Sequence, residues 1–235
     1  MNEGHTYDVA IVGYGPVGAT AANLLGQRGL RVVVIERDPD VYLRARAIST
    51  DEETMRIWQQ AGLADRRNAE MQPGAGANFV DTRGKTIIRL LPVDRGNGHP
   101  PQQFIYQPAV DTALREGVER FPNVSVLLEH ECGQVVQSAD SVELTLTDLT
   151  DGEVKGIRAR YVIAADGGSS SLRAQLGIGF SGRTFSERWI VIDTKVLREW
   201  PGHERLRFHC NPARPTVDCP TPLGHHRWEF PVREE

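Results

Sequence analysis

Residues 7–37 contain the pattern that most constrains the fold of this chain. The apolar run Val9–Val12 leads into Gly13-Tyr14-Gly15-Pro16-Val17-Gly18, a sequence of the form G-x-G-x-x-G. A segment with helical spacing of apolar residues follows, and then the β-branched run 31–35, which is typical of a buried parallel strand and ends at Glu36. The pattern predicts strand, glycine turn, helix and strand, and therefore an α/β fold.

The three glycines have different roles in such a turn. Gly13 permits the tight turn, Gly15 lets a pyrophosphate approach the backbone, and Gly18 lets the helix pack closely on the sheet. Pro16 is tolerated in the first helical turn because its missing N–H has no helical partner there. The free N–H groups and the positive end of the helix dipole attract phosphate.

Glu36 lies 23 residues after Gly13, close to the spacing of about 20 expected for the acidic residue that accepts ribose hydroxyls. The turn, the helix and this residue together predict a dinucleotide site. The alternative is a glycine-rich turn of an α/β fold without a ligand. The motif does not choose between FAD and NAD(P).

The helix after the motif is expected to pack through Val17, Ala21, Leu24 and Leu25, which recur at helical spacing, and to end at Gly29. A second helix is expected to begin near Ser49 or Thr50, either of which can cap it, because Glu52 and Glu53 lie three residues further on. Arg44 and Arg46 precede that helix and are either solvated loop charges or ligand contacts.

Composition limits the classes of partner. The chain has 235 residues, of which 40% are hydrophobic and 25% charged, with a formal net charge of −4. These values are ordinary for a globular protein and disfavour nucleic acid or an anionic membrane as partner. No apolar stretch approaches the ~20 residues that span a bilayer, and the N-terminus lacks the basic region of a signal peptide. Cys132, Cys210 and Cys219 form no CxxC, which suggests reduced thiols and a cytoplasmic location.

The middle of the chain is expected to leave the first sheet and return to it. Residues 79–80 and 86–90 flank Asp81-Thr82-Arg83-Gly84, which predicts a hairpin in another sheet. Gln107-Pro108 opens a helix with Val110, Leu114, Val118 and Phe121 on one face. Strands at 124–128, 142–146 and 157–165 are then expected to form a three-stranded meander.

The last of these strands ends in Asp166-Gly167-Gly168-Ser169-Ser170-Ser171-Leu172-Arg173, a D-G-x-x-S-x-x-R sequence. An apolar strand that ends in Asp-Gly places the carboxylate at the carboxyl edge of the sheet, where open α/β sheets bind ligands. Ser169 or Ser170 can cap the short helix that follows. Taken alone, the segment is better explained as a turn followed by a capped helix, and it becomes specific only together with the opening motif.

The two motifs together resemble those of the single-component flavoprotein aromatic hydroxylases, which have the p-hydroxybenzoate hydroxylase fold. Segments such as RARAISTDEETMRIWQQAGL, FIYQPAVDTALREGVERFPNV and VIAADGGSSSLR extend the resemblance along nearly the whole chain. It implies a Rossmann-like FAD-binding domain interleaved with a β-sheet substrate domain. It also implies an FAD-dependent monooxygenase that uses NADH or NADPH and O₂ to hydroxylate a phenolic aromatic acid, such as 3-(3-hydroxyphenyl)propionate or 3-hydroxycinnamate.

The resemblance assigns cofactor contacts residue by residue. The FAD pyrophosphate is expected along the glycine turn, the adenosine ribose at Glu36, the flavin side of the cofactor at Arg46, and the ribityl chain near Gln107. Asp166 is expected to contact FAD and to shape the approach of the nicotinamide. The full set of implied cofactor contacts is Gly13, Gly15, Pro16, Val17, Gly18, Glu36, Arg37, Arg46, Gln107 and Asp166. No catalytic base is identified.

The resemblance also predicts the domain boundaries and the extent of the chain. Residues 1–70 and 101–180 correspond to the FAD-binding domain, and residues 71–100 and 181–235 to an incomplete substrate domain. Family members continue past residue 235 to a third motif, a Gly-Asp after a strand, so the chain is expected to be the N-terminal portion of a hydroxylase and to lack part of the flavin pocket. Whether it forms a homo-oligomer is left open.

Two other readings of function remain from the sequence, namely a different flavin or nicotinamide oxidoreductase and a non-catalytic fragment that binds nucleotide or a partner. No G-x-S-x-G supports a hydrolase. A metal site is not expected, because the spacing of the late histidines and cysteines matches no zinc pattern. These residues are His203, His209, Cys210, Cys219, His225 and His226. Trp189, Trp200 and Trp228 are expected in the core, with the walls of a pocket as the alternative.

Overall fold

The computed structural model describes residues 6–44, 46–64 and 70–232. The chain forms two compact units, of which unit 1 comprises residues 1–44 and 108–181, and unit 2 comprises residues 45–107 and 182–235. The boundaries expected from the sequence fell after residues 70, 100 and 180. The assignment of FAD binding and substrate binding to separate domains stays a prediction.

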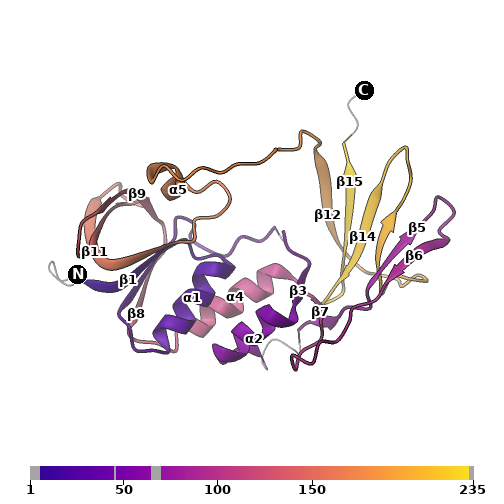
Figure 1. Ribbon diagram of the computed structural model, residues 1–235, viewed down its shortest axis with the longest axis horizontal. Coiled ribbons are helices and arrows are strands. Elements are labelled where there is room, and N and C mark those ends of the chain that lie inside the picture. Colours follow the sequence, from indigo (N-terminus) through magenta and orange to yellow (C-terminus); the bar gives the residue numbers. More distant parts are fainter. Residues whose placement is uncertain (1–5, 45, 65–69, 233–235) are drawn as a thin grey trace. The chain divides into compact units, whose positions relative to one another are not determined.

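Unit 1 is built on a six-stranded sheet in the order β8-β2-β1-β11-β10-β9 (Figure 1). Its bounds are β1 (Tyr7–Val12), β2 (Val32–Ile35), β8 (Val124–Leu127), β9 (His130–Gln137), β10 (Val142–Asp148) and β11 (Val154–Ala164). β8, β2, β1 and β11 run parallel, whereas β10 is antiparallel to both of its neighbours. The predicted parallel pair of β1 and β2 is thus confirmed.

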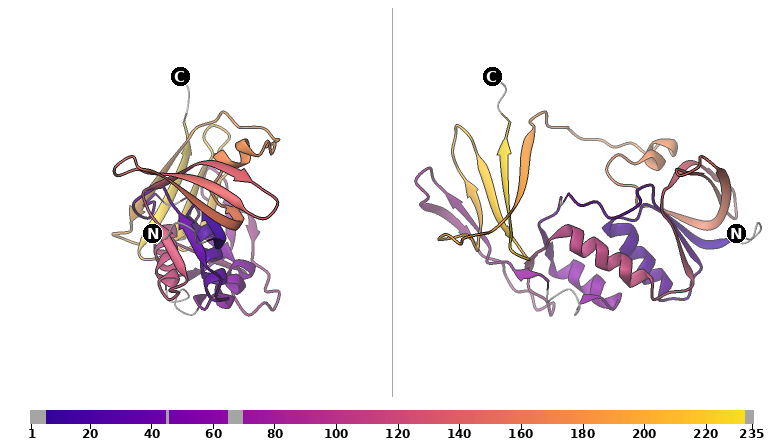
Figure 2. Two further views of the ribbon diagram at one scale, coloured as in Figure 1. Left: turned by 90° about the vertical axis from the view of Figure 1, so that its left-hand side faces the viewer. Right: turned by 180° about the vertical axis from the view of Figure 1, so that it is seen from behind.

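The central strands are buried on both faces, which is why they are rich in valine and isoleucine. One face contributes Ala10, Val12, Val33 and Ile35 to a core that also includes Leu144 of β10. On the opposite face lie the helices α1 (Pro16–Gly26) and α4 (Gln107–Val118), side by side in Figures 1 and 2. The amide nitrogen of the Asn23 side chain joins them by donating to the carbonyl oxygen of Leu114 at 2.8 Å.

The face through which α1 packs differs from the expected one. Its buried residues are Gly18, Ala19, Ala22, Asn23 and Gly26. Small side chains lie on this face because the helix approaches its neighbours closely: a Cβ on Gly26 would stand 2.8 Å from the Phe121 ring. The expectation that Val17, Ala21, Leu24 and Leu25 form the packing face was therefore wrong, since hydrophobic spacing does not reveal a face built from glycine and alanine.

The helix predicted from Gln107 is confirmed, with Val110, Leu114 and Val118 buried. The meander is also present, but one of its strands was misassigned. β8 pairs in parallel with β2, whereas the meander consists of β9, β10 and β11. β9 has the mostly polar sequence HECGQVVQ and a bulge opposite Thr145–Leu146, so it lacks the alternation that identifies an exposed strand.

Unit 2 contains a second six-stranded sheet in the order β12-β15-β14-β13-β5-β6. Its strands are β5 (Ala77–Val80), β6 (Thr86–Leu90), β12 (Trp189–Lys195), β13 (Leu206–His209), β14 (Thr216–Thr221) and β15 (His225–Pro231). The predicted hairpin is confirmed, because β5 and β6 are antiparallel neighbours. A smaller sheet consists of β3 (Ser49–Asp51), β7 (Gln102–Phe104) and β4 (Gln72–Pro73).

The helix α2 (Glu52–Gln60) begins later than expected. Its N-cap is Asp51, whose side chain accepts a hydrogen bond from the N–H of Thr54. Ser49 and Thr50, the expected caps, belong to β3 and pair with Phe104 and Gln103. Carboxylate and hydroxyl side chains cap equally well, so the sequence could not choose among three adjacent candidates.

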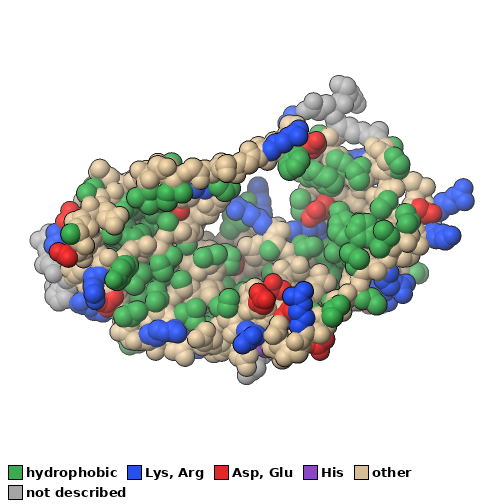
Figure 3. Space-filling view, in the orientation of Figure 1, with side chains coloured by type: hydrophobic (Ala, Val, Ile, Leu, Met, Phe, Trp, Pro, Cys, Tyr) green, Lys and Arg blue, Asp and Glu red, His purple; other side chains and the backbone are tan. Residues whose placement is uncertain are grey.

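The surface is partly apolar. In Figure 3 hydrophobic side chains gather over the strands of unit 2, and Trp189, Ile190, Val191 and Ile192 of β12 are all exposed. The prediction that Trp189 lies in the core was therefore wrong.

All three cysteines are free. Among the described residues, no helix is both long and apolar enough to cross a membrane.

Candidate functional site

The glycine turn after β1 is tightly packed at two of its three glycines. Gly13 has a φ of +101°, and a Cβ there would stand 2.3 Å from the carbonyl oxygen of Ala165. A Cβ on Gly18 would stand 1.9 Å from the carbonyl oxygen of Gly13. Both positions therefore require glycine for reasons internal to the protein.

Gly15 differs from the other two glycines, because a Cβ there would meet no atom within 4 Å. Its backbone is extended, with φ −71° and ψ −172°, and it is the N-cap of α1 without any side-chain cap. Within the described part of the chain, the N–H groups of Gly15, Val17 and Gly18 have no protein acceptor. An open space beside unpaired N–H groups at a helix N-terminus is the arrangement that binds a phosphate.

Glu36 is held beside this turn. Its Oε2 accepts a hydrogen bond from the N–H of Tyr14 at 2.7 Å, and its Oε1 accepts one from the N–H of Asp38 at 3.0 Å. Each carboxylate oxygen has a second lone pair, so both can still accept a hydroxyl. The carboxylate thus lies next to the phosphate-binding position with the capacity that a ribose diol requires.

Asp166 follows β11, whose end lies beside the end of β1. Its Oδ1 accepts from the hydroxyl of Ser170 at 2.6 Å, and its Oδ2 accepts from the N–H of Leu172 at 3.2 Å. Partial burial by itself raises the pKa of Asp166, but these hydrogen bonds outweigh it and hold the pKa below its usual value. Ser170 also caps the helix α5 (Ser171–Gln175) by accepting from the N–H of Arg173.

The sheet order brings these segments together. The connection after β1 leads to β2 on one side, whereas β11 pairs with β1 on the other side, so the strand order reverses at β1. A crevice forms outside the carboxyl ends of the strands at such a switch point and is the usual ligand site of open α/β sheets. Gly13, Gly15, Glu36 and Asp166, all predicted from the sequence, lie at this edge of unit 1.

The residues present fit the adenosine diphosphate part of FAD. The open side of Gly15 and the unpaired N–H groups suit the pyrophosphate, and the Glu36 carboxylate suits the ribose. The helix has no acidic residue in its first turn, so no carboxylate of that turn opposes a bound phosphate. Pro16 occupies the first turn of α1 as expected. The side chains of Val17 and Arg37 are exposed, and contact between these residues and FAD stays a prediction.

Two further predicted residues, Arg46 and Gln107, meet within unit 2. The side-chain oxygen of Gln107 accepts hydrogen bonds from the N–H groups of Arg46 and Ala47, both at 2.8 Å. The Gln107 amide thereby fixes the backbone on which Arg46 stands. The expected contacts of these residues with the flavin and ribityl parts of FAD stay predictions.

Sequence reasoning missed the residue that holds the same backbone from its other side. Arg227 of β15 is 2% exposed and forms a two-point pair with Asp193 of β12, with N–O distances of 2.8 and 2.9 Å. It also donates to the carbonyl oxygen of Arg46 at 2.8 Å. An arginine between His226 and Trp228 was the available signal, but Asp193 and Arg46 lie far away in the sequence.

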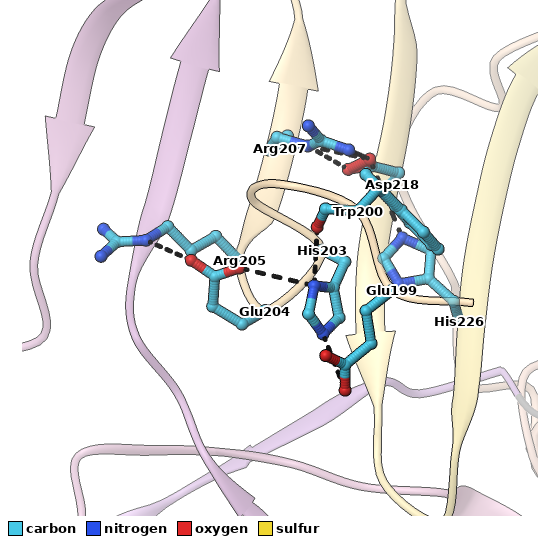
Figure 4. Close-up of polar contacts among 8 residues, drawn as sticks. All are labelled: Glu199, Trp200, His203, Glu204, Arg205, Arg207, Asp218 and His226. Atoms are coloured by element: carbon cyan, nitrogen blue, oxygen red, sulfur yellow. Dashed lines mark hydrogen bonds and ion pairs between the residues drawn. The ribbon is translucent and has the colours of Figure 1, made fainter. Parts of the chain in front are cut away.

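Three of the late histidines belong to a polar cluster around Asp218 of β14. His203 lies in the loop before β13, His209 on β13 and His226 on β15, and Figure 4 shows His203 and His226 with Asp218. The buried Asp218 binds Arg207 at two points and has the Nε2 atoms of His209 and His226 at 3.6 and 3.8 Å. Burial alone raises the pKa of Asp218, but His226 and Arg207 lower it below its usual value. Among residues 6–44, 46–64 and 70–232, no group of His, Cys, Asp and Glu is arranged to hold a metal ion.

The aromatic side chains around this cluster explain two of the three late tryptophans. Trp200 stacks on Trp228 with a centroid distance of 5.8 Å and meets His226 edge-on at 4.8 Å. The carbonyl oxygen of Trp200 also contacts Nδ1 of His203 at 2.7 Å. These contacts fix the loop that precedes β13 and give the cluster a structural role.

Comparison with known proteins adds two hydroxylases of similar sequence. The 3-(3-hydroxy-phenyl)propionate/3-hydroxycinnamic acid hydroxylase of Comamonas testosteroni is 39% identical over 225 residues, which are 96% of this chain and 38% of that protein. The protein of the same name from Mycolicibacterium gilvum is 35% identical over 235 residues, which are 100% of this chain and 40% of that protein. The chain thus spans about two fifths of the length of these relatives.

Solved structures show the same fold. The p-nitrophenol 4-monooxygenase of Pseudomonas putida superimposes with a TM-score of 0.88 at 25% identity, covering 98% of this chain and 58% of that one. A flavin-dependent monooxygenase solved with FAD and substrate gives 0.87 at 24% identity, covering 99% of this chain and 44% of that one. The profile of a protein family described as the FAD binding domain matches residues 6–219. This chain therefore belongs to the FAD binding domain family.

Proposed function

We propose that this chain is the FAD-binding part of a monooxygenase that uses NADH or NADPH to hydroxylate a phenolic aromatic acid. The two relatives described above are named as hydroxylases of 3-(3-hydroxyphenyl)propionate and 3-hydroxycinnamic acid. We propose an acid of this class as the substrate. The free state of the three cysteines supports a reducing, cytoplasmic location.

The open space beside Gly15 carries the proposal. Gly13 and Gly18 are required by the packing of the protein itself, but nothing in the protein fills the position of a Cβ on Gly15. A ligand that lies against the backbone explains why a side chain is lacking at that point. The unpaired N–H groups of Gly15, Val17 and Gly18 favour a ligand with a negatively charged group at this point. The Glu36 carboxylate favours a ligand that also carries a ribose.

When bound, FAD supplies the electron transfer and oxygen chemistry that amino-acid side chains lack. The residues of unit 1 bind and orient the adenosine diphosphate part. The ionised Asp166 carboxylate, fixed by Ser170 and Leu172, places a negative charge at the same edge of the sheet. In unit 2, Gln107 and Arg227 hold the backbone of Arg46 from both sides, which suits a residue that must keep one position.

The first experiment measures the visible absorption spectrum of the purified chain after FAD is added, followed by NADH and NADPH oxidation. Oxidation is compared with 3-(3-hydroxyphenyl)propionate, with 3-phenylpropionate and with no addition. The second acid lacks only the phenolic hydroxyl, so it fills the same space without an activated ring. Hydroxylated product is measured by mass spectrometry.

Bound flavin and oxidation stimulated by the phenolic acid alone, with formation of the hydroxylated product, are the expected results. Bound flavin with a rate of NADH or NADPH oxidation that neither acid changes would indicate a different flavin oxidoreductase. A folded chain without flavin would instead indicate a non-catalytic fragment.

A further inference from the structure

Tyr14, the residue between the first two glycines of the turn, forms hydrogen bonds and a ring contact with an arginine of α4. Nε of Arg115 donates to the carbonyl oxygen of Tyr14 at 3.1 Å, and the hydroxyl of Tyr14 donates to the carbonyl oxygen of Arg115 at 3.3 Å. The Arg115 guanidinium carbon lies 4.6 Å from the centre of the Tyr14 ring. Two residues 101 positions apart in the sequence are thus joined by three contacts.

These contacts determine where a neighbouring N–H group points. The carbonyl of Tyr14 and the N–H of Gly15 belong to one trans peptide unit, in which the two groups point in opposite directions. The hydrogen bond from Arg115 to the Tyr14 oxygen therefore turns the Gly15 N–H away from Arg115. That N–H is one of the three at the turn that have no protein acceptor within the described residues.

The preceding peptide unit is fixed as well, because the N–H of Tyr14 donates to Glu36 at 2.7 Å. Glycine restrains the backbone least of all residues, so a turn with glycine on both sides of Tyr14 loses much conformational entropy when it becomes ordered. Contacts made before the ligand arrives reduce the ordering that binding itself must produce. Glu36 and Arg115 provide such contacts on opposite sides of Tyr14.

We infer that Arg115 is a positioning residue for the pyrophosphate of FAD, which it affects through the Tyr14–Gly15 peptide unit without touching the cofactor. The inference rests on the proposed FAD binding. Tyr14 contributes its hydroxyl as a donor throughout the physiological range, because burial raises the pKa of Tyr14 to about 12 although the charge of Arg115 opposes the rise.

Two substitutions separate the hydrogen bond from the charge. Arg115→Gln places an amide nitrogen where Nε of the arginine stands, and so keeps a donor without the charge. The methionine of Arg115→Met is about as long as the glutamine but has neither a hydrogen-bond donor nor a charge. Arg120→Met serves as the matched control, because Arg120 also bonds to α1 through Asn23 and lies over an aromatic ring, that of Phe121.

The dissociation constants of FAD and of ADP are measured for the full chain and the three variants, together with the thermal midpoint of each without ligand. We expect Arg115→Met to weaken both ligands about tenfold, the effect of one charge-assisted hydrogen bond. Arg115→Gln should stay within about threefold of the original chain. Arg120→Met should lower the midpoint without changing either dissociation constant. The inference would be overturned if Arg115→Gln and Arg115→Met weakened ligand binding equally. It would also be overturned if Arg115→Met and Arg120→Met did so.

Hydrogen exchange of the turn, residues 11–18, distinguishes this inference from the proposed function. If the original chain binds neither FAD nor ADP, the proposed function fails and exchange alone decides about Arg115. Faster exchange of the Tyr14 amide in Arg115→Met, but not in Arg115→Gln or Arg120→Met, supports the positioning role. Unchanged exchange in Arg115→Met contradicts it.

Discussion

The carbonyl oxygen of Ala165 lies 2.3 Å from the position that a Cβ on Gly13 would occupy. The N–H of Ala165 donates to the carbonyl oxygen of Val12 at 2.8 Å, so the ends of β1 and β11 are in direct contact. Two motifs that are far apart in the sequence thereby form one edge of one sheet. Asp166 stands beside the glycine turn for this reason.

Substitution of Gly13 should damage the fold itself. Gly13→Ala adds a backbone penalty of about 1–2 kcal/mol for the positive φ and about 1–3 kcal/mol for overpacking against Ala165. Urea unfolding should therefore show a loss of roughly 2–5 kcal/mol in the free energy of unfolding. Gly156→Ala in β11 is the control, since a Cβ there meets nothing within 4 Å. Equal stability of the two variants would contradict the close approach of β1 and β11.

The ribose role of Glu36 can be separated from flavin binding in general. Glu36→Gln removes the charge that strengthens hydrogen bonds from ribose hydroxyls and from the N–H of Tyr14. FAD and ADP should bind about tenfold more weakly, the effect of about 1.4 kcal/mol. FMN has no adenosine, so its affinity should change much less. A similar loss for all three ligands would show that the substitution merely disturbs the turn.

How much of this could be predicted from the sequence depends on the range of the contacts. The glycine turn, α4 and the hairpin β5–β6 follow from local patterns, because turn residues and hydrophobic spacing act within a few residues. The pairing of β8 with β2 and the identity of β9 depend on tertiary context. Glu36 and Asp166 were predicted because motifs mark them.

Contacts between distant polar residues leave no local pattern. Arg115 lies in a helix that the spacing of its apolar residues already predicts. Nothing near Arg115 in the sequence indicates a contact with Tyr14. Arg227 bonds to Asp193 and to the backbone of Arg46, which lie 34 and 181 positions away in the sequence. The packing face of α1 was missed for a different reason, since two of its buried residues, Gly18 and Gly26, have no side chain that a hydrophobic pattern could reveal.

Asp166 should make the free energy of unfolding depend on pH in the acidic range. Its pKa in the folded chain is lowered, whereas an unfolded aspartate has a pKa of about 3.9. Its contribution is therefore fully present above about pH 4 and is lost as the pH falls through the lower folded value. The difference in free energy of unfolding between the original chain and Asp166→Asn should be constant near pH 7 and shrink below about pH 4. A difference that stays constant down to about pH 2 would contradict this assignment.

The pair of Arg227 and Asp193 should matter far more than an exposed pair. Arg227 is 2% exposed and Asp193 30%, so Arg227→Met leaves a partly buried carboxylate and the Arg46 carbonyl without their donor. We expect a loss of about 2–4 kcal/mol, slightly less than for a fully buried pair. Arg158→Met is the control, because Arg158 and Glu143 are 58% and 60% exposed and such pairs contribute less than about 1 kcal/mol. Chemical denaturation measures both, and losses of equal size would refute the structural role of Arg227.

FAD titration of the original chain, Gly15→Ala and Gly156→Ala, followed by quenching of flavin fluorescence, decides whether the pyrophosphate lies against Gly15. An alanine at Gly15 meets no protein atom within 4 Å and suits the extended backbone, so all three proteins should unfold at similar urea concentrations. We expect the original chain and Gly156→Ala to bind FAD equally well, and Gly15→Ala to bind it at least about tenfold more weakly, because its methyl group occupies the pyrophosphate position. A folded Gly15→Ala protein that binds FAD as tightly as the original chain would show that the pyrophosphate does not lie against Gly15.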